Sequence, residues 1–582
     1  MAEANWRRRY RAASLSLPSW ARLAPERLLY TSNGSGKTEV YAWDRAAGSQ
    51  REVTDRPEGT TRAALEPPGE RIWWFDDDRG SEHGVWRVEP FAGGPSEPAA
   101  PNLPAAYGAG LALARGFAVI GSSDDGGTRI HRAAGSVSEL LYEHPESATV
   151  AGLARDESLL AIEHSEHGDS RHPAVRVLDL SGRPLAELWD GPGRGLGAGA
   201  WSPVEGDQRL LVVHERTGLS RPSVWSPPAA DVRELSYELP GDVSAAWYPD
   251  ARALLLSHDH RGRSELYRYD LETDTLHPLE TEPGTIGGAR VRADGELWYS
   301  FSSGARPPSV MRDREVLLQP PGEPAPAGRP YRDLQVGPVH GFLVEPEGPP
   351  PHPTLFLVHG GPQAHDRDAF SARVQAWVDH GFAVALVNYR GSSGYGREWR
   401  DALERSPGLT ELEDILAVRE HLVAGGVARP QPIVLSGGSW GGYLTLLGLG
   451  TQPEAWDLGI AIVPVADSVA EYEDEMEPLK AYDRALFGGS PAERPDFYQE
   501  RSPITYVQRV RVPVLILAGR NDPRCPIRQI ENYLRRLQEL GKPNEFYEFA
   551  AGHSSLVTDE QIRQMEAQLD FAHRHVGTPA PL

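Results

Sequence analysis

Cysteine is almost missing from this sequence, since Cys525 is the single one among 582 residues. A lone cysteine excludes an internal disulfide framework and any zinc site built from several thiolates. A single cysteine is therefore compatible with a reducing or an oxidising compartment. We expect a cytoplasmic protein, because a reducing compartment does not favour disulfides.

Long apolar runs are missing as well. Val512–Ala518 is among the longest apolar stretches, and it is far shorter than the roughly 20 residues that a membrane-spanning helix needs. Arg7, Arg8 and Arg9 make the N-terminus basic, but no apolar segment follows them, so this region does not match a secretory signal. We expect no membrane partner.

Positively charged residues are fewer than negatively charged ones. The chain has 59 Lys and Arg against 82 Asp and Glu, which gives a net charge of −23. Such a chain repels phosphate backbones, so we expect no nucleic-acid partner. We find no phosphate-binding loop, dinucleotide fingerprint or metal-ligand cluster, and therefore expect no cofactor and no metal. The length exceeds what one hydrophobic core supports, which predicts two or more domains.

Short β-rich runs recur through the first half of the chain. Each unit has one such run, a polar turn, and a second run that ends near an aromatic or acidic residue. The spacing averages about 45 residues, which is the period of a four-stranded propeller blade. We therefore predict an all-β, seven-bladed propeller, with a pair of β-sandwiches as the alternative. The units begin near Leu28, Ile72, Phe117, Leu159, Leu210, Leu254 and Leu297.

The pattern changes after a segment rich in proline and glycine, QPPGEPAPAGRP at 319–330, which we interpret as a linker. Beyond it, buried apolar strands alternate with helical runs, a pattern typical of a wound α/β sheet. We expect strands near Thr354–Val358, Pro432–Leu435 and Val512–Ala518, and a helix over Leu409–Ala424.

The motif G-x-S-x-G occurs at Gly437–Gly441, between a predicted strand and a helix-like run. This is the context of the nucleophile elbow of α/β-hydrolases. Ser439 would occupy a sharp, strained turn, which leaves no room for side chains at Gly437 and Gly441. A glycine-rich structural turn is the alternative interpretation.

A serine hydroxyl needs a base before it becomes a useful nucleophile. In this fold an acid and then a histidine follow the serine along the chain. Asp522 follows a buried strand, and His553 follows the strand-like run 545–549. We predict that His553 is the general base and Asp522 its orienting acid. Asp559 comes after His553, which is the wrong order for the acid.

An oxyanion hole needs two fixed hydrogen-bond donors. The N–H of Trp440, directly after the serine, is predicted to be one. The other is expected in the loop His359–Pro362, most simply the N–H of Gly361. This loop could instead be only a tight turn.

These features together resemble the prolyl oligopeptidase family of serine peptidases, and its acylaminoacyl-peptidase-like branch in particular. Trp440 departs from the pattern, because the family more often has Tyr or another residue after the nucleophile. The motifs that carry the resemblance are His359–Pro362, Asn388–Gly396, the Ser439 elbow, Asn521–Pro526 and Gly552–His553.

The resemblance implies a propeller joined to an α/β-hydrolase domain and a triad of Ser439, Asp522 and His553. It implies short peptide substrates, because the propeller covers the active site and excludes folded proteins. A homo-oligomer is also expected, since family members often form closed assemblies. The predicted division is an N-terminal helix that packs on the hydrolase domain (1–20), the propeller (21–320), the linker (321–333) and the catalytic domain (334–582).

Two further residues are candidates for substrate binding. Arg524 matches a position where this branch often has an arginine near the active site, although a surface salt bridge is an equal interpretation. Tyr472 lies in the acidic segment 469–482, between the serine and the acid. That segment either favours basic or amino-terminal groups or is a solvated helix face, and we prefer the solvated face.

Several functions remain open from the sequence. A peptidase that releases blocked N-terminal residues, an aminopeptidase and a carboxypeptidase all fit. A free carboxylate would need an arginine fork and a free amine would need carboxylates. A carboxylesterase could use the same triad, and a non-catalytic binding protein is the remaining alternative.

Overall fold

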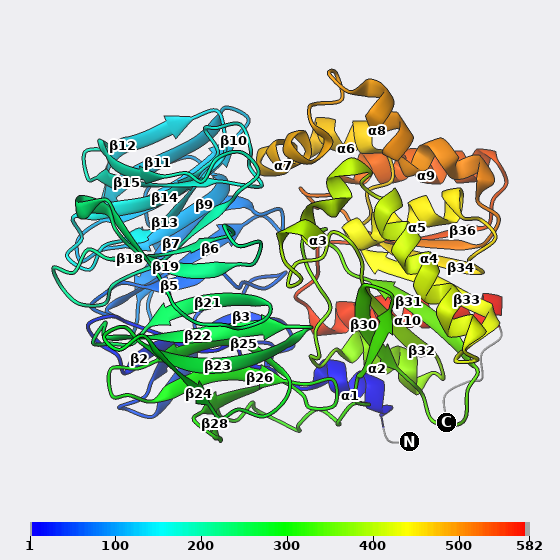
Figure 1. Ribbon diagram of the computed structural model, residues 1–582, viewed down its shortest axis with the longest axis horizontal. Coiled ribbons are helices and arrows are strands. Elements are labelled where there is room, and N and C mark those ends of the chain that lie inside the picture. Colours follow the sequence, from blue (N-terminus) through cyan, green and yellow to red (C-terminus); the bar gives the residue numbers. More distant parts are fainter. Residues whose placement is uncertain (1–2, 577–582) are drawn as a thin grey trace.

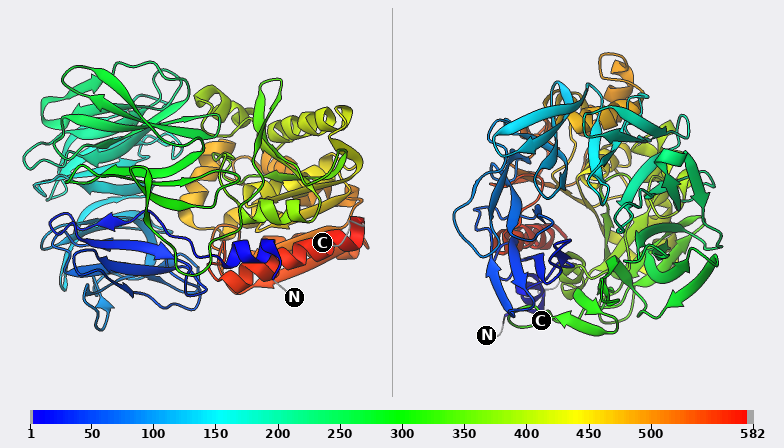
Figure 2. Two further views of the ribbon diagram at one scale, coloured as in Figure 1. Left: turned by 90° about the horizontal axis from the view of Figure 1, so that it is seen from below. Right: turned by 90° about the vertical axis from the view of Figure 1, so that its left-hand side faces the viewer.

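The computed structural model describes residues 3–576; residues 1–2 and 577–582, at the ends of the predicted helical and catalytic segments, lie outside the described part. The chain folds into an N-terminal β-propeller and a C-terminal α/β-hydrolase domain (Figure 1). Viewed from the propeller side, the sheets of the first domain form a ring in front of the second (Figure 2, right).

Five sheets of the propeller are separate and four-stranded. In each, consecutive strands pair antiparallel and a polar turn connects them, as the alternation of apolar and polar residues predicts. They comprise β1 (Ser19–Trp20), β2 (Arg27–Ser32), β3 (Glu39–Asp44) and β4 (Ser49–Glu52); β13 (Ala148–Leu153), β14 (Leu159–His164), β15 (Ala174–Asp179) and β16 (Pro184–Leu188); β17 (Leu196–Trp201), β18 (Leu210–His214), β19 (Arg221–Ser226) and β20 (Asp231–Glu234); β21 (Asp242–Trp247), β22 (Ala253–His260), β23 (Arg263–Asp270) and β24 (Thr275–Leu279); and β25 (Thr285–Val291), β26 (Leu297–Ser302), β27 (Ser309–Arg312) and β28 (Glu315–Leu318).

The other eight strands of the propeller form a single sheet, so the prediction of seven separate four-stranded blades is wrong there. Strand β7 extends beyond its partner β8, and its free edge at His83 and Gly84 pairs with Tyr107 and Ala106 of β9. Pairing satisfies main-chain groups that would otherwise stay exposed on an edge. The sheet contains β5 (Ala63–Leu65), β6 (Arg71–Asp77), β7 (His83–Pro90), β8 (Glu97–Pro98), β9 (Ala106–Leu113), β10 (Ala118–Asp124), β11 (Gly127–Ala134) and β12 (Val137–His144).

Tryptophan packing connects the first and last sheets of the ring. The fully buried Trp298 of β26 lies against Trp20 of β1 and Trp43 of β3, with ring centroids 5.7 and 6.3 Å apart. The Arg292 guanidinium lies 4.5 Å from the Trp298 ring centroid and pairs with Glu26. Apolar and cation–π contacts between side chains thus join these two sheets.

The hydrolase domain contains one eight-stranded sheet with the order β29-β30-β32-β31-β33-β34-β35-β36. Strands β31 to β36 run parallel, and only β29 and β30 are antiparallel to their neighbours. The strands are β29 (Arg332–Val336), β30 (Val339–Val344), β31 (His352–Val358), β32 (Ala383–Asn388), β33 (Ala428–Gly438), β34 (Leu458–Ile462), β35 (Val514–Gly519) and β36 (Asn544–Phe549).

Helices cover both faces of this sheet, and one hydrophobic cluster lies on each side. Strands buried on both faces explain the continuous apolar runs in the sequence. The helix over Leu409–Ala424 has the predicted bounds, whereas β29 begins at Arg332, inside the predicted linker, because it pairs with β30. The helices are α1 (Asn5–Arg11), α2 (Ala372–Asp379), α3 (Arg397–Asp401), α4 (Leu409–Ala424), α5 (Trp440–Thr451), α6 (Ser468–Asp474), α7 (Glu477–Phe487), α8 (Pro495–Arg501), α9 (Ile527–Glu539) and α10 (Thr558–Val576).

Helix α1 packs on the hydrolase domain beside α2 and α10 (Figure 2, left). Trp6 is buried in the same cluster as Trp377 of α2 and Phe571 of α10. The guanidinium of Arg9 lies 2.6 Å from Asp379 and donates to the carbonyl of Ala327. The N-terminal segment therefore starts on the hydrolase domain before the chain enters the propeller.

Candidate active site

Ser439 connects β33 to α5 in a strained conformation, with φ 56° and ψ −122°. A residue other than glycine rarely adopts such a φ outside functional turns. A Cβ atom at Gly441 would lie 2.2 Å from the carbonyl oxygen of Val358. One at Gly437 would lie 2.4 Å from the carbonyl carbon of Gly441. The two glycines therefore permit the sharp strand–turn–helix geometry that the motif predicts.

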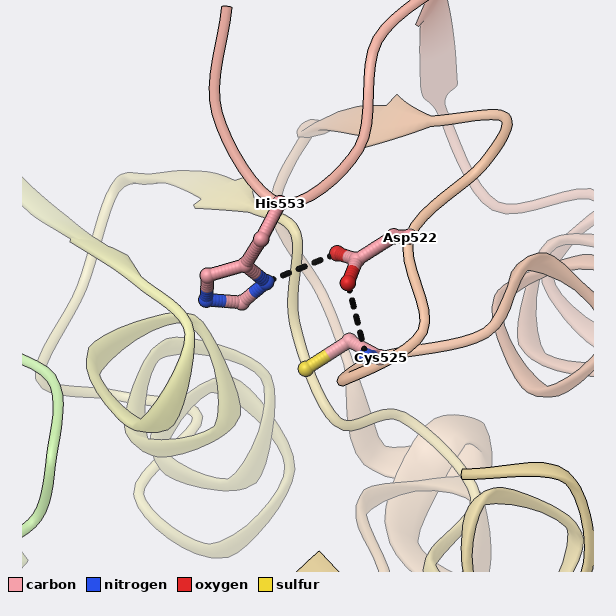
Figure 3. Close-up of side chains that lie close together, drawn as sticks. All are labelled: Asp522, Cys525 and His553. Atoms are coloured by element: carbon pink, nitrogen blue, oxygen red, sulfur yellow. Dashed lines mark hydrogen bonds and ion pairs between the residues drawn. The ribbon is translucent and has the colours of Figure 1, made fainter. Parts of the chain in front are cut away.

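Asp522 and His553 form a hydrogen-bonded pair (Figure 3). Nδ1 of His553 lies 2.8 Å from Oδ2 of Asp522. The other carboxylate oxygen accepts the main-chain N–H groups of Arg524 and Cys525 at 2.9 and 3.1 Å. These donors fix the carboxylate, which in turn orients the imidazole. The rival acid Asp559 instead pairs with Arg11 at 2.8 Å.

The loops that carry these residues follow the carboxyl ends of parallel strands. Ser439 follows β33, Asp522 follows β35 and His553 follows β36, while His359 follows β31. Carboxyl ends of parallel strands meet at one edge of a sheet, where ligands bind in open α/β folds. The topology therefore brings all four loops to the same edge.

The loop after β31 lies directly against the elbow. A Cβ atom at Gly360 would be 3.2 Å from Cβ of Ser439 and 3.6 Å from the main-chain nitrogen of Trp440. Gly361 has φ +123°, a conformation that favours glycine. Buried side chains hold His359: its Nε2 lies 2.8 Å from Ser392 Oγ, and Tyr389 donates to its carbonyl. Burial lowers the pKa of His359 to about 4, so its ring is neutral.

The Cys525 thiol beside His553 is not suited to nucleophilic chemistry or to metal binding. Ligand-type atoms of Asp522, Cys525 and His553 lie within 4.8 Å of one another. Burial, with Asp522 and Glu471 nearby, raises the pKa of the Cys525 thiol well above its usual range. A protonated thiol is neither a nucleophile nor a metal ligand, and the imidazole Nδ1 already contacts the carboxylate.

A cavity of about 210 Å³ lies between His553 and the propeller. Arg524 lines it and forms a bidentate pair with Glu82 of the propeller at 2.6 and 3.0 Å. Glu82 also lies 3.2 Å from Arg62. Arg524 therefore lines the cavity and forms an ion pair that crosses between the domains, and its role in substrate binding stays a prediction.

The turn between β6 and β7 contacts the histidine loop through its backbone. A Cβ atom at Gly552 would lie 1.8 Å from the carbonyl oxygen of Gly80. The side chain of Asn521 bridges the two domains, donating to the carbonyl oxygens of Arg79 at 3.4 Å and Ala550 at 3.2 Å. Sequence reasoning missed Gly80 and Glu82, because nothing in a propeller turn indicates which loop of another domain it touches.

Tyr472 is not among the residues that line this cavity. Its ring packs against Tyr498, with centroids 5.9 Å apart, and Arg484 donates to its hydroxyl at 3.2 Å. The residue therefore contacts neighbouring helices, and the structure does not bring it to the cavity beside His553.

The interpretation of segment 469–482 as a solvated face is wrong for two carboxylates. Glu471 of α6 and Glu475, which directly follows that helix, are buried, whereas Glu473 is exposed. Burial, with Asp483 nearby, raises the pKa of both groups well above the usual range. One carboxylate oxygen of Glu475 has no hydrogen-bond partner among the described residues.

Glu475→Gln is expected to stabilise the protein at pH 8 and not at pH 4. The unfolded carboxyl loses its proton above about pH 4.3, whereas burial raises the pKa of the folded one, so the wild type loses stability as the pH rises above this value. We expect a gain in Tm of roughly 2–4 °C at pH 8, as for about 1 kcal/mol. Thermal unfolding from pH 4 to 8 measures it, with exposed Glu473→Gln as control. A gain that does not grow with pH would contradict the explanation.

Comparisons with known proteins agree with this architecture. Residues 368–579 match the prolyl oligopeptidase family. The chain is 27% identical over 372 residues to the acylamino-acid-releasing enzyme of Rattus norvegicus, covering 57% of this chain and 50% of that enzyme. It is 24% identical over 554 residues to dipeptidyl aminopeptidase BIII of Pseudoxanthomonas mexicana, covering 89% and 74%. The chain thus spans about half the length of the rat enzyme.

Solved structures share the whole fold. A crystal structure of puromycin hydrolase has a TM-score of 0.85 at 20% identity and covers 99% of this chain and 97% of its own. Pyrococcus horikoshii acylaminoacyl peptidase has a TM-score of 0.73 at 17% identity, with 100% and 98% covered. Among residues 3–576, no helix is both long and apolar enough to cross a membrane. The C-terminal region of the chain, residues 368–579, thus matches the prolyl oligopeptidase family, and the chain is similar to acylaminoacyl-peptidase-type relatives in sequence and fold.

Proposed function

We propose that the protein is a serine peptidase that hydrolyses short peptides through Ser439, His553 and Asp522. The observation that carries the proposal is the 2.8 Å contact between His553 and Asp522, at the sheet edge where the strained serine turn also lies. A carboxylate holds the histidine in the tautomer that can accept a proton from serine. A structural histidine would not require this arrangement.

The reaction follows from these positions. Ser439 Oγ attacks the peptide carbonyl while His553 Nε2 takes its proton, and the carbonyl π electrons move to oxygen. The N–H groups of Trp440 and Gly361 stabilise that oxyanion. His553 then protonates the leaving amine as the C–N bond breaks, which leaves an acyl-enzyme. Water, activated by His553, releases the acid and restores the serine.

The substrate is proposed to be a short peptide or an N-acylated residue. Two observations support a size limit: the propeller turn at Gly80 contacts the histidine loop, and Glu82 pairs with Arg524 over the cavity. A folded protein could not enter without separating these contacts. Relatives that release acylated residues or dipeptides support exopeptidase action. Aminopeptidase or carboxypeptidase action is the alternative within this class.

The remaining features of the proposal come from the sequence. We propose the division into residues 1–20, 21–320, 321–333 and 334–582, a homo-oligomeric assembly and a cytoplasmic location. The burial of Trp6 against α2 supports the packing of the N-terminal helix on the hydrolase domain. A carboxylesterase or lipase is less favoured, because a bulky propeller that covers a lipid-binding site would have no function there.

A peptide panel analysed by mass spectrometry tests the proposed specificity. It contains short peptides with free, acetylated or amidated ends, a p-nitrophenyl ester and a folded protein, with Ser439→Ala as control. We expect release of a terminal residue from short peptides, acetylated ones included, and no cleavage of the folded protein. Ester hydrolysis without any peptide cleavage would overturn the peptidase assignment in favour of an esterase.

A further inference from the structure

Glu411 is a buried carboxylate that the proposed mechanism does not use. It lies near the start of α4 with 0% of its surface exposed. Its Oε1 accepts a hydrogen bond from the indole Nε1 of Trp440 at 3.0 Å, and its Oε2 has no partner among the described residues. Burial raises the pKa of Glu411 to about 8, so the carboxyl is largely protonated at neutral pH. An apolar residue would fill this position at lower cost if packing were the only requirement.

The bonding partner of Glu411 is the residue directly after the nucleophile. Trp440 is the first residue of α5, and its main-chain N–H is one of the two proposed oxyanion donors. The indole and this N–H belong to one residue, which follows the strained turn at Ser439. If the main chain at Trp440 rotated, the indole would leave the reach of Glu411.

A second contact joins the same two helices, which lie side by side in Figure 1. Gly408, at the N-terminus of α4, has φ +83°, and a Cβ atom there would lie 2.4 Å from the Tyr443 hydroxyl. The rings of Trp440 and Tyr443 pack with centroids 4.5 Å apart. The start of α5 is therefore held against the start of α4 by one buried hydrogen bond and by close packing.

We propose that Glu411 is a positioning residue that fixes the oxyanion N–H of Trp440 through the indole hydrogen bond. The inference rests on the proposed function. An oxyanion donor helps only if it is aimed in advance at the oxygen that becomes charged. Losing the hydrogen bond between the Trp440 indole and Glu411 should therefore weaken transition-state binding more than substrate binding.

The test compares kcat and KM for a short peptide in Glu411→Leu, Glu411→Gln and Trp440→Phe. We expect Glu411→Leu and Trp440→Phe to lower kcat about 10- to 100-fold, which is at most the decrease caused by losing a whole oxyanion donor. KM should stay within about threefold of the wild-type value. A peptidyl boronic acid, which forms a tetrahedral serine adduct, should bind more weakly by a similar factor. Glu411→Gln keeps an acceptor and should restore most of the rate.

Two controls separate this positioning role from general destabilisation. Glu413, exposed on the same helix, is replaced by Leu and should leave kcat within about twofold, as surface substitutions usually do. In the Trp440→Phe background, Glu411→Leu should cause little further loss, because the shared hydrogen bond is already gone.

The outcomes are distinct. Folded Glu411→Leu with unchanged kcat would overturn the inference, as would additive effects in the double variant. If Glu411→Leu does not fold, an unchanged kcat in Trp440→Phe overturns it in the same way. Turnover retained by Ser439→Ala would instead refute the proposed function, whatever the Glu411 variants do.

Discussion

Ser439→Ala should abolish peptide turnover while the protein stays folded. Removing the serine of a triad commonly lowers kcat by a factor of about 10⁶, and leaves only the catalysis that binding and oxyanion stabilisation supply. The loss is expected to be this large because the proposed reaction begins with attack by the Oγ of Ser439, which stands on the strained turn at φ 56° and which the variant lacks. Steady-state kinetics on a short peptide measures the effect.

The matching control is Ser181→Ala, in an exposed turn of the propeller. It should leave kcat within about twofold, and both variants should unfold within a few degrees of the wild type. If Ser439→Ala kept a tenth of the wild-type kcat, Ser439 could not be the nucleophile. Equal losses in both variants would point to a fault in the preparation instead of the site.

Asp522→Asn should lower kcat by about 10⁴ with little change in KM, as expected when an orienting acid is replaced by an amide. The amide still accepts the N–H groups of Arg524 and Cys525, so the loop should keep its structure. Its NH₂ group, however, would face His553 Nδ1 and favour the tautomer in which Nε2 carries the proton. That nitrogen could then no longer accept the serine proton.

Asp559→Asn provides the comparison, because this acid lies close to His553 in the sequence but pairs with Arg11. Its kcat should remain within about twofold of the wild type. The triad assignment requires that the two aspartates differ by at least 100-fold in effect. A larger loss from Asp559→Asn would show that the wrong acid has been assigned.

Local motifs made the catalytic loops predictable from the sequence. The glycines around Ser439, the order of acid and histidine, and the runs of buried strand residues each depend on neighbours in the chain. The family resemblance is confirmed, and Leu409–Ala424 is a helix with the predicted bounds. Such features follow from short-range sterics and hydrophobic periodicity, which a sequence displays directly.

Long-range contacts were not predictable in the same way. Glu82 and Arg524 are 442 residues apart in the chain, so no spacing rule connects them. The pairing of β7 with β9, which joins eight strands in one sheet, depends on how the edge of β7 is exposed after folding. The burial of Glu471 depends on which face of α6 turns inward, and a run of acidic residues in the sequence indicates solvent exposure instead.

The most direct test of the account is the intact mass of the protein after rapid mixing with an activated peptide ester and acid quench. We predict a transient mass increase equal to one acyl group on the wild type, located by peptide mapping at Ser439 and absent from Ser439→Ala. An acyl group on another residue, or turnover without any acylated protein under conditions where deacylation is slow, would contradict the covalent serine mechanism.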